Sequence, residues 1–253
     1  MRDLLFPMAA SDFKSRYAGT ALGAVWAFLQ PLVTILVYVF VFSVGFKSAP
    51  VSGVPYVLWL LCGMVPWLFF SEVWSGATGA LFSYAPLVKK TRFPVELLPP
   101  VRAVSALFVH AIFFALLVVT VLLCGEPLTA YALQAVYYSL CTFALALGLG
   151  VLCAAVSPFF RDVVNTVAIA LQVGFWITPV AWSPALFAEN IVRALKFNPV
   201  FYVVQGYRDS FLGGVWFWQR PAWGLYFWLV TGAVWAAAAF LFKRLRPQFA
   251  DAL

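Results

Sequence analysis

Charge is scarce in this chain, and so are the side chains that most catalytic sites require. Of its 253 residues, 10% are charged, 64% are hydrophobic and one is a histidine. Soluble domains carry about 25% charged residues, so this composition indicates an integral membrane protein. Membrane topology explains the net charge of +7 better than nucleic-acid binding does. We therefore expect no nucleic-acid partner.

Nucleotide, metal and nucleophile motifs are also missing from the sequence. It has no GxxxxGK[ST] phosphate loop, no GxSxG nucleophile elbow and no HExxH zinc motif. The four cysteines have no CxxC spacing and lie in or at the end of apolar runs, so we interpret them as small core residues. We expect no catalytic residue, no metal site and no cofactor on this chain.

Six uncharged runs are long enough to cross a membrane as helices, which need about 20 apolar residues each. They cover residues 17–46, 48–71 with a continuation to 88, 103–125, 127–160, 163–188 and 221–242. No run alternates polar and apolar residues over about ten positions, as an outer-membrane barrel would. The N-terminal residues 1–16 lack the apolar centre of a cleavable signal peptide. The sequence predicts an all-α membrane protein with six spans in a single transmembrane domain, 1–253.

The basic residues predict the orientation of these spans. With an inner N-terminus, the inner segments hold eleven Lys and Arg residues and the outer segments hold five. Four of the five outer residues lie in one long loop. The positive-inside rule therefore places both termini in the cytoplasm and the chain in the cytoplasmic (inner) membrane as a multi-pass protein.

Three segments interrupt the spans. The first, 1–22, contains a predicted amphipathic helix over 2–16 that lies in the cytoplasmic interface. Its apolar residues Leu4, Leu5, Met8, Ala9 and Phe13 are near one face, and its charged residues Asp12, Lys14 and Arg16 are elsewhere. The second, 84–100, is an inner loop containing the basic, proline-broken island LVKKTRFPVELLP. The third, 183–220, is too long for a simple connection and too apolar for a solvated loop. We interpret it as short helices that enter the membrane from outside and are buried in protein or line a cavity.

Two ionisable residues lie inside the predicted spans. Glu72 is the one acid within a span, and we expect it to face the bundle interior, a water-filled cavity or a subunit contact, or to be a hydrogen-bonded packing residue. His110 is more typical of a packed or hydrogen-bonded helix residue than of a ligand. Aromatic residues make up 19% of the chain, and they fit an interfacial belt, a core or a sugar path.

Four motifs occur in the order in which they are found in the permease subunits of type-2 ABC exporters. Residues 16–32 (RYAGTALGAVWAFLQPL) resemble the start of their first span, and the island at 87–99 resembles their first cytoplasmic loop. FRDV at 160–163, with LQ at 171–172 and TPV at 178–180, is similar to their fourth-to-fifth connection and fifth helix. NPV at 198–200, YRD at 207–209 and LGG at 212–214 are similar to their outer segment. The subgroup with the greatest resemblance exports lipid-linked polysaccharide such as O-antigen, capsule or teichoic acid. AWSP at 181–184 departs from the Tyr-Pro of many relatives and bears on the substrate.

The resemblance implies how such a chain works. Two copies would form a channel for a lipid-linked polysaccharide, because six helices are too few to enclose a hydrated polymer. Two separate ATPase subunits would bind ATP and Mg²⁺. The expected ATPase contacts are Arg16, Lys89, Lys90, Arg92, Glu96, Arg161 and Asp162. The expected channel or gate residues are Glu72, Trp176, Thr178, Asn198, Tyr207, Arg208 and Asp209, with Arg208 and Asp209 at a wet outer mouth.

Other interpretations fit the same residues. Lys89, Lys90 and Arg92 also fit a topology signal bound to anionic lipid, and Arg161 with Asp162 fits a local ion pair that closes a turn. At the level of function, the alternatives are a type-2 ABC exporter of a small hydrophobic compound or drug, and a membrane-embedded glycosyl- or acyltransferase. An enzyme would need clustered acids or histidines on one membrane side, whereas this chain has one His and one acid within its spans.

Overall fold

A computed structural model describes residues 2–16, 19–45, 50–51, 53–90 and 93–252, without the side chains at 2, 3, 90, 250 and 251. The described residues form helices, turns and one isolated bridge between Val51 and Val54. The predicted all-α fold is confirmed. The α-helices are α1 (Arg2–Arg16), α2 (Trp26–Val39), α3 (Tyr56–Thr78), α4 (Ala80–Ser83), α5 (Ala85–Lys90), α6 (Leu98–Leu123), α7 (Gln134–Val156), α8 (Asp162–Ile177), α9 (Glu189–Leu195), α10 (Pro199–Arg208), α11 (Pro221–Leu245) and α12 (Phe249–Ala252).

Short 3₁₀ and π segments extend or connect these helices. They are η1 (Gly23–Val25), η2 (Phe40–Gly45), η3 (Val95–Leu97), η4 (Ala130–Leu133), η5 (Pro184–Leu186), η6 (Asp209–Gly213), η7 (Phe217–Gln219) and η8 (Arg246–Gln248). With these extensions, five helices of the described chain are long and apolar enough to cross a membrane: Gly23–Gly45, Tyr56–Thr78, Val95–Leu123, Ala130–Val156 and Pro221–Gln248.

The fifth predicted span forms a shorter helix than the others. Its helix α8 has 16 residues, which corresponds to about 24 Å, whereas the hydrocarbon core is about 30 Å thick. Thr178 precedes Pro179, and a residue in that position disfavours helical backbone. Accordingly Thr178 is extended, at φ −78° and ψ 132°, and α8 ends at Ile177. The rest of the run continues as turns and η5 rather than as helix.

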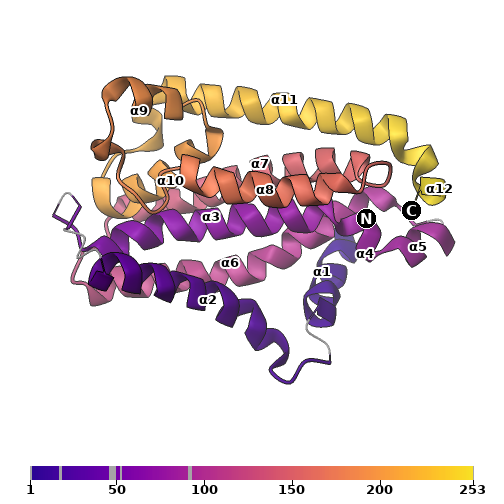
Figure 1. The fold of residues 1–253 in the computed structure, drawn as a ribbon, viewed down its shortest axis with the longest axis horizontal. Helices are drawn as coiled ribbons and strands as arrows, with labels where there is room; N and C mark the ends of the chain where they lie inside the picture. The colour runs from indigo at the N-terminus through magenta and orange to yellow at the C-terminus, as the bar shows by residue number, and fades with distance from the viewer. Residues whose placement is uncertain (1, 17–18, 46–49, 52, 91–92, 253) are drawn as a thin grey trace.

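Helix α3 is the centre of the bundle, and α6 and α7 pack against it. Close contact between α3 and α7 requires a small residue at Gly150, where a Cβ would lie 2.4 Å from the Cβ of Ala77. Helices α2, α8 and α11 lie at the periphery, and α8 and α11 leave most of their side chains exposed. The long helices run roughly along one axis, with α11 on one side of α3 and α2 on the other (Figure 1).

The two ends of this bundle differ. One end carries α1, α4, α5, α12 and the chain termini, and the opposite end carries α9 (Figure 1). We call them the terminal end and the α9 end. The helix predicted over 2–16 is confirmed as α1, which packs against α6. On the predicted apolar face Ala9 is buried and Leu4 is 53% exposed, whereas Asp12, which was expected off that face, is 3% exposed.

Candidate functional site

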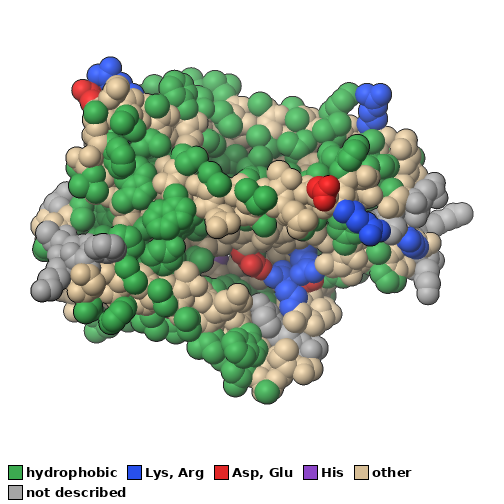
Figure 2. All heavy atoms as spheres, viewed as in Figure 1, with side chains coloured by type: hydrophobic (Ala, Val, Ile, Leu, Met, Phe, Trp, Pro, Cys, Tyr) green, Lys and Arg blue, Asp and Glu red, His purple; other side chains and the backbone are tan. Residues whose placement is uncertain are grey.

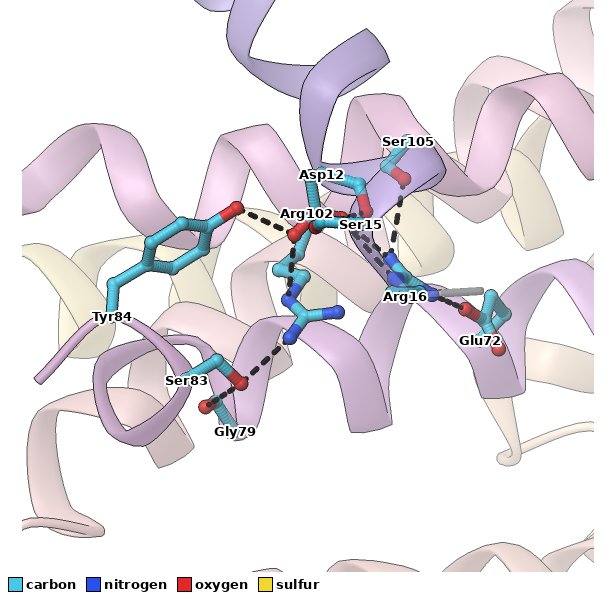
Figure 3. Close-up of polar contacts among 9 residues, drawn as sticks. All are labelled: Asp12, Ser15, Arg16, Glu72, Gly79, Ser83, Tyr84, Arg102 and Ser105. Carbon is cyan, nitrogen blue, oxygen red and sulfur yellow. Dashed lines mark hydrogen bonds and ion pairs between the residues drawn. The ribbon is translucent and has the colours of Figure 1, made fainter. Parts of the chain in front are cut away.

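A cluster of four charged side chains fastens α1 to the bundle at the terminal end. It consists of Asp12 and Arg16 from α1, Glu72 from α3 and Arg102 from α6, and we call it the charge cluster (Figure 3). Asp12 and Arg16 are one helical turn apart, so their side chains meet on one face of α1. The cluster contains two cations and two anions and is electrically balanced.

Asp12 is the hub of the charge cluster and is 3% exposed. Its Oδ2 accepts hydrogen bonds from Nε and Nη2 of Arg16, both at 3.1 Å. Its Oδ1 accepts one from the Tyr84 hydroxyl at 2.5 Å and lies 3.3 Å from Nε of Arg102, an ion pair without hydrogen-bond alignment. Burial and the hydrogen bond to Asp12 raise the pKa of Tyr84, so this hydroxyl stays protonated and donates.

Arg16 and Arg102 connect the charge cluster to neighbouring helices. Arg16 pairs with Glu72 through Nη1, and its Nη2 lies 3.3 Å from Oγ of Ser105 on α6. Burial alone would lower the pKa of Arg16, but the carboxylates of Glu72 and Asp12 raise it above its ordinary value. Arg102 donates from Nη2 to Oγ of Ser83 in α4 at 2.6 Å. Helices α1, α3, α4 and α6 are thereby joined by one network (Figure 3).

Glu72 also lines a groove of about 270 Å³ that lies between α2, α3 and α6. Polar lining residues include Gln30, Thr34 and Ser75, and the apolar walls come from all three helices. Figure 2 shows a hollow on this face in which acidic, basic and histidine atoms lie among hydrophobic ones. A polar groove of this kind, set in an apolar surface, suits a hydrated or polar molecule.

His110 lies at the inner end of this groove and is packed, as predicted. Its ring stacks on Phe69 with centroids 4.0 Å apart, and it is 8% exposed. Nε2 lies 3.1 Å from Oγ of Ser139 and 3.2 Å from the hydroxyl of Tyr207, which is itself 2.5 Å from Oγ of Ser139. These three side chains connect α6, α7 and α10. Tyr207 is 0% exposed, so it is a linking residue of the core.

The other predicted gate residues lie around α10, which is wedged between α3 and α7. Asn198 caps α10 by accepting from the amide of Val200 at 3.0 Å, and its Nδ2 donates to the buried Oγ1 of Thr178 at 2.8 Å. This bond ties the start of α10 to the end of α8. Trp176 is 54% exposed on α8.

Arg208 and Asp209, which were expected at a wet outer mouth, both line a depression at the α9 end but are themselves almost fully buried. Arg208 is 4% exposed and Asp209 is 5% exposed. The Arg208 guanidinium lies over the Trp59 ring, with its Cζ 3.4 Å from the centroid, and donates from Nη2 to the Val180 carbonyl at 3.0 Å. Packing of α10 against α3 brings both side chains inside the bundle, beneath this depression.

The predicted ATPase contacts are dispersed over the terminal end. Lys89 on α5 is exposed, and so are Arg161 and Asp162, which begin α8. No ion pair joins Arg161 to Asp162 among the residues described. Glu96 pairs with Arg246 of η8. The side chain of Lys90, and Arg92 entirely, lie outside the described residues, and Arg16 is engaged in the charge cluster.

Sequence reasoning missed the residues that complete these networks. Asp12, Tyr84 and Arg102 were not singled out as site residues, and neither were Trp59 and Arg220. The spacing of Asp12 and Arg16 at i and i+4 was a usable signal for an ion pair. No pattern along the chain indicates that Trp59, in a different run, meets Arg208.

The helical bundle and its five apolar spans define a multi-pass membrane protein. The family pattern of the ABC-2 type transporter matches residues 4–212. The chain belongs to this family, and the resemblance to type-2 ABC exporter permeases is confirmed. Members of the family work with ATPase subunits in membrane exporters.

Curated relatives align with almost the whole chain. The O-antigen export system permease protein RfbA of Myxococcus xanthus is 28% identical over 254 residues, covering 100% of this chain and 96% of its own length. An O-antigen export system permease protein RfbA of Klebsiella pneumoniae is 26% identical, covering 99% and 95%. The polysialic acid transport protein KpsM of Escherichia coli is 23% identical, covering 80% and 79%. These relatives are transporter permeases rather than enzymes.

Proposed function

We propose that this chain is the permease subunit of an ATP-driven exporter that moves lipid-linked polysaccharide across the cytoplasmic membrane. The observation that carries the proposal is the end-to-end similarity to O-antigen permeases. The more distant similarity to a polysialic acid transport protein extends it to capsule-type polymers. The drug-exporter and transferase alternatives have no such support among these relatives.

The polysaccharide path is proposed to form between two copies of the chain. The groove between α2, α3 and α6 is too small to hold a polymer, and it is open along one side. Helices α2 and α8 leave apolar side chains exposed, among them Leu36 at 56%, Ile169 at 61% and Trp176 at 54%. A two-fold axis that brings these faces together would cover them and enlarge the path. Exposed aromatics such as Trp176 would offer uncharged stacking surfaces for sugar rings.

The terminal end is proposed to face the cytoplasm and to contact the ATPase subunits. Both termini and α5 lie at this end (Figure 1). The exposed residues Lys89, Arg161 and Asp162 would meet the ATPase together with Lys90, Arg92 and Glu96. The charge cluster would then transmit its motion, because Arg16 and Asp12 join α1 to the spans that line the groove.

Segment 183–220 is proposed to close the other end of the path. It forms η5, α9, α10, η6 and η7, with α10 inserted between α3 and α7. A gate must open for a polymer and shut without one. A cysteine at Leu212, beside the depression, should therefore change its reactivity toward a membrane-impermeant thiol reagent while ATP is turned over with substrate. Reactivity that is constant during turnover would speak against a gate.

The proposed function is tested by deletion and complementation in the native host. Loss of the chain should stop the appearance of surface polysaccharide while the lipid-linked polymer accumulates inside, and restoring the chain should reverse both effects. The matched control restores the chain together with an ATPase subunit that is unable to hydrolyse ATP, and accumulation should persist. Normal surface polysaccharide in the deletion strain would refute the proposal. A charge reversal at Lys89, compared with one at the α9-end residue Arg193, tests the cytoplasmic contact separately.

A further inference from the structure

Arg208, at the end of α10, is a buried cation that forms no ion pair with any carboxylate the structure describes. Its Nη2 donates to the Val180 carbonyl, but Nε and Nη1 find no hydrogen-bond partner among the residues described. Buried polar groups in folded proteins almost always have partners, and a charged donor left unpaired is costly. Two unused donors on a guanidinium that is 4% exposed therefore indicate a ligand.

The neighbouring carboxylate does not neutralise Arg208. Oδ1 of Asp209 accepts from Nε2 of Gln205 at 2.9 Å, and its Oδ2 pairs with Nη1 of Arg220 at 2.6 Å. Asp209 is thus engaged by other donors. Two arginines and one aspartate leave this region with a net charge of +1, which favours an anion.

The position of the Arg208 guanidinium is fixed by α3. The face of Trp59 holds it by a cation–π contact, with 3.4 Å between Cζ and the ring centroid. On the same helix, Gly63 gives it room, since a Cβ at that position would lie 2.9 Å from Nη2 of Arg208. The group is therefore held in place before any ligand arrives, which reduces the entropy lost on binding.

Arg208 forms part of the wall of a depression of about 230 Å³ at the α9 end. It is lined by Arg208, Asp209, Gln205, Trp59 and Ser183, with further apolar walls. Its volume is several times the roughly 30 Å³ that one water molecule occupies in the liquid. Ser183 and Gln205 add neutral hydrogen-bonding groups beside the cation. The space, charge and donors fit a small oxygen-bearing anion.

We propose that these residues, the Arg208 site, bind an oxyanion, that is, a phosphate or carboxylate group. The planar guanidinium fork matches the oxygens of such groups and forms charge-assisted hydrogen bonds with them. The chemistry can come from two sources: an anionic group on the exported glycan lipid, which rests on the proposed function, or the headgroup of a phospholipid. Binding from either source occupies the unused donors of Arg208.

The test measures anion binding to the purified full-length chain in nanodiscs of zwitterionic phosphatidylcholine. Inorganic phosphate and glucuronate are titrated by calorimetry, with glucose as the neutral comparison. Wild type should bind both anions and not glucose, and Arg208→Met should weaken anion binding at least about tenfold, as expected for the loss of charge-assisted hydrogen bonds. The matched control is Arg193→Gln, whose side chain is 70% exposed at the same end, and its affinity should equal that of wild type.

A second variant and a second lipid sharpen the result. Arg208→Lys keeps the charge but loses the planar fork, so its anion affinity should lie between those of wild type and Arg208→Met. If Arg208→Met does not fold, the comparison of wild type with Arg208→Lys provides the test. The titration is repeated in nanodiscs that contain anionic phosphatidylglycerol. If the lipid headgroup fills the site, it competes with the added anion, and the ratio between the anion affinities of wild type and Arg208→Met becomes smaller. If the anion belongs to the cargo, that ratio is retained and Arg208→Met reduces export.

Equal phosphate affinity in wild type and the Arg208 variants would overturn the proposal. The binding experiment needs neither the ATPase nor the glycan. If the proposed export function is wrong, the result of the binding experiment is therefore unchanged. If the anion does not bind, the proposed export function is likewise unaffected.

Discussion

The arginines at the two ends of the bundle are partnered in opposite ways. At the terminal end, Arg16 and Arg102 meet the carboxylates of Asp12 and Glu72, so the charges balance within the chain. At the α9 end, Arg208 rests on Trp59 and one backbone carbonyl, and among the described residues no carboxylate forms an ion pair with it. The first arrangement is complete in a single chain and serves attachment. The second is incomplete, which suits a site that something else must enter.

This difference predicts opposite responses to removing a charge. Removing Asp12 from the balanced charge cluster removes the carboxylate that pairs with Arg102 and one of the two that pair with Arg16, and breaking ion pairs of a buried carboxylate is strongly destabilising. A variant that removes an unpaired buried cation takes away a desolvated charge and leaves little behind.

The largest effect is expected from Asp12→Asn. Asp12 is 3% exposed and holds two arginines, so its loss should lower the free energy of unfolding by about 3–5 kcal/mol. Unfolding in mixed micelles with increasing sodium dodecyl sulfate measures this change. The matched control is Glu72→Gln, a partner of Arg16 whose side chain is 41% exposed, which should lose no more than about 1 kcal/mol. Equal losses for the two variants would contradict Asp12 as the hub.

The next effect tests the fit of α10 at the α9 end. A Cβ at Gly206 would lie 2.1 Å from Cε1 of Tyr138, so Gly206→Ala forces the ring or α10 to shift. Overpacking of this kind lowers stability by about 1–3 kcal/mol. Gly232→Ala on α11 is the control, because no atom lies within 4 Å of its added Cβ, and it should be neutral or slightly stabilising. Partial rescue by Tyr138→Leu would identify the ring as the obstacle.

The sequence predicted the spans more successfully than the polar contacts. Long apolar runs form helices in a membrane because every backbone group must be hydrogen-bonded internally. That requirement is local, so the first, second, third, fourth and sixth runs could be located from composition. The length of α8 was also accessible in principle, since Pro179 disfavours helix at Thr178.

The polar networks depend on which helices meet, and the sequence does not contain that information in any one segment. Asp12 contacts Arg102 across 90 positions, and Trp59 meets Arg208 across a greater separation. The rule that intramembrane charges seek water led us to place Arg208 at a wet mouth. The same rule also allows an intramembrane charge to be buried against partners such as a backbone carbonyl. Whether Arg208 finds such partners depends on how α10 packs.

A small effect is expected from Arg208→Met, and it distinguishes the two ends most directly. The variant loses a cation–π contact and one hydrogen bond but also removes a buried, unpaired charge, so stability should change by no more than about 1 kcal/mol. Asp209 keeps Gln205 and Arg220 and is not left alone. The same mixed-micelle titration as for Asp12→Asn gives the comparison. A loss as large as that of Asp12→Asn would mean that Arg208 is structural rather than open to a ligand.

The smallest effect is expected where an arginine is paired but exposed. Arg193 and Glu189 form an i,i+4 pair on α9 at 2.7 Å, with side chains 70% and 80% exposed. Water screens such a pair, and ordering two long side chains offsets most of its attraction, so Arg193→Gln should lower stability by about 0–0.5 kcal/mol. Raising the salt concentration should erase even this difference, whereas the effect of Asp12→Asn should persist because its partners are shielded from solvent. A salt-insensitive loss at Arg193 would show that exposure does not separate the arginines of this protein, and burial would then no longer explain the contrast between its ends.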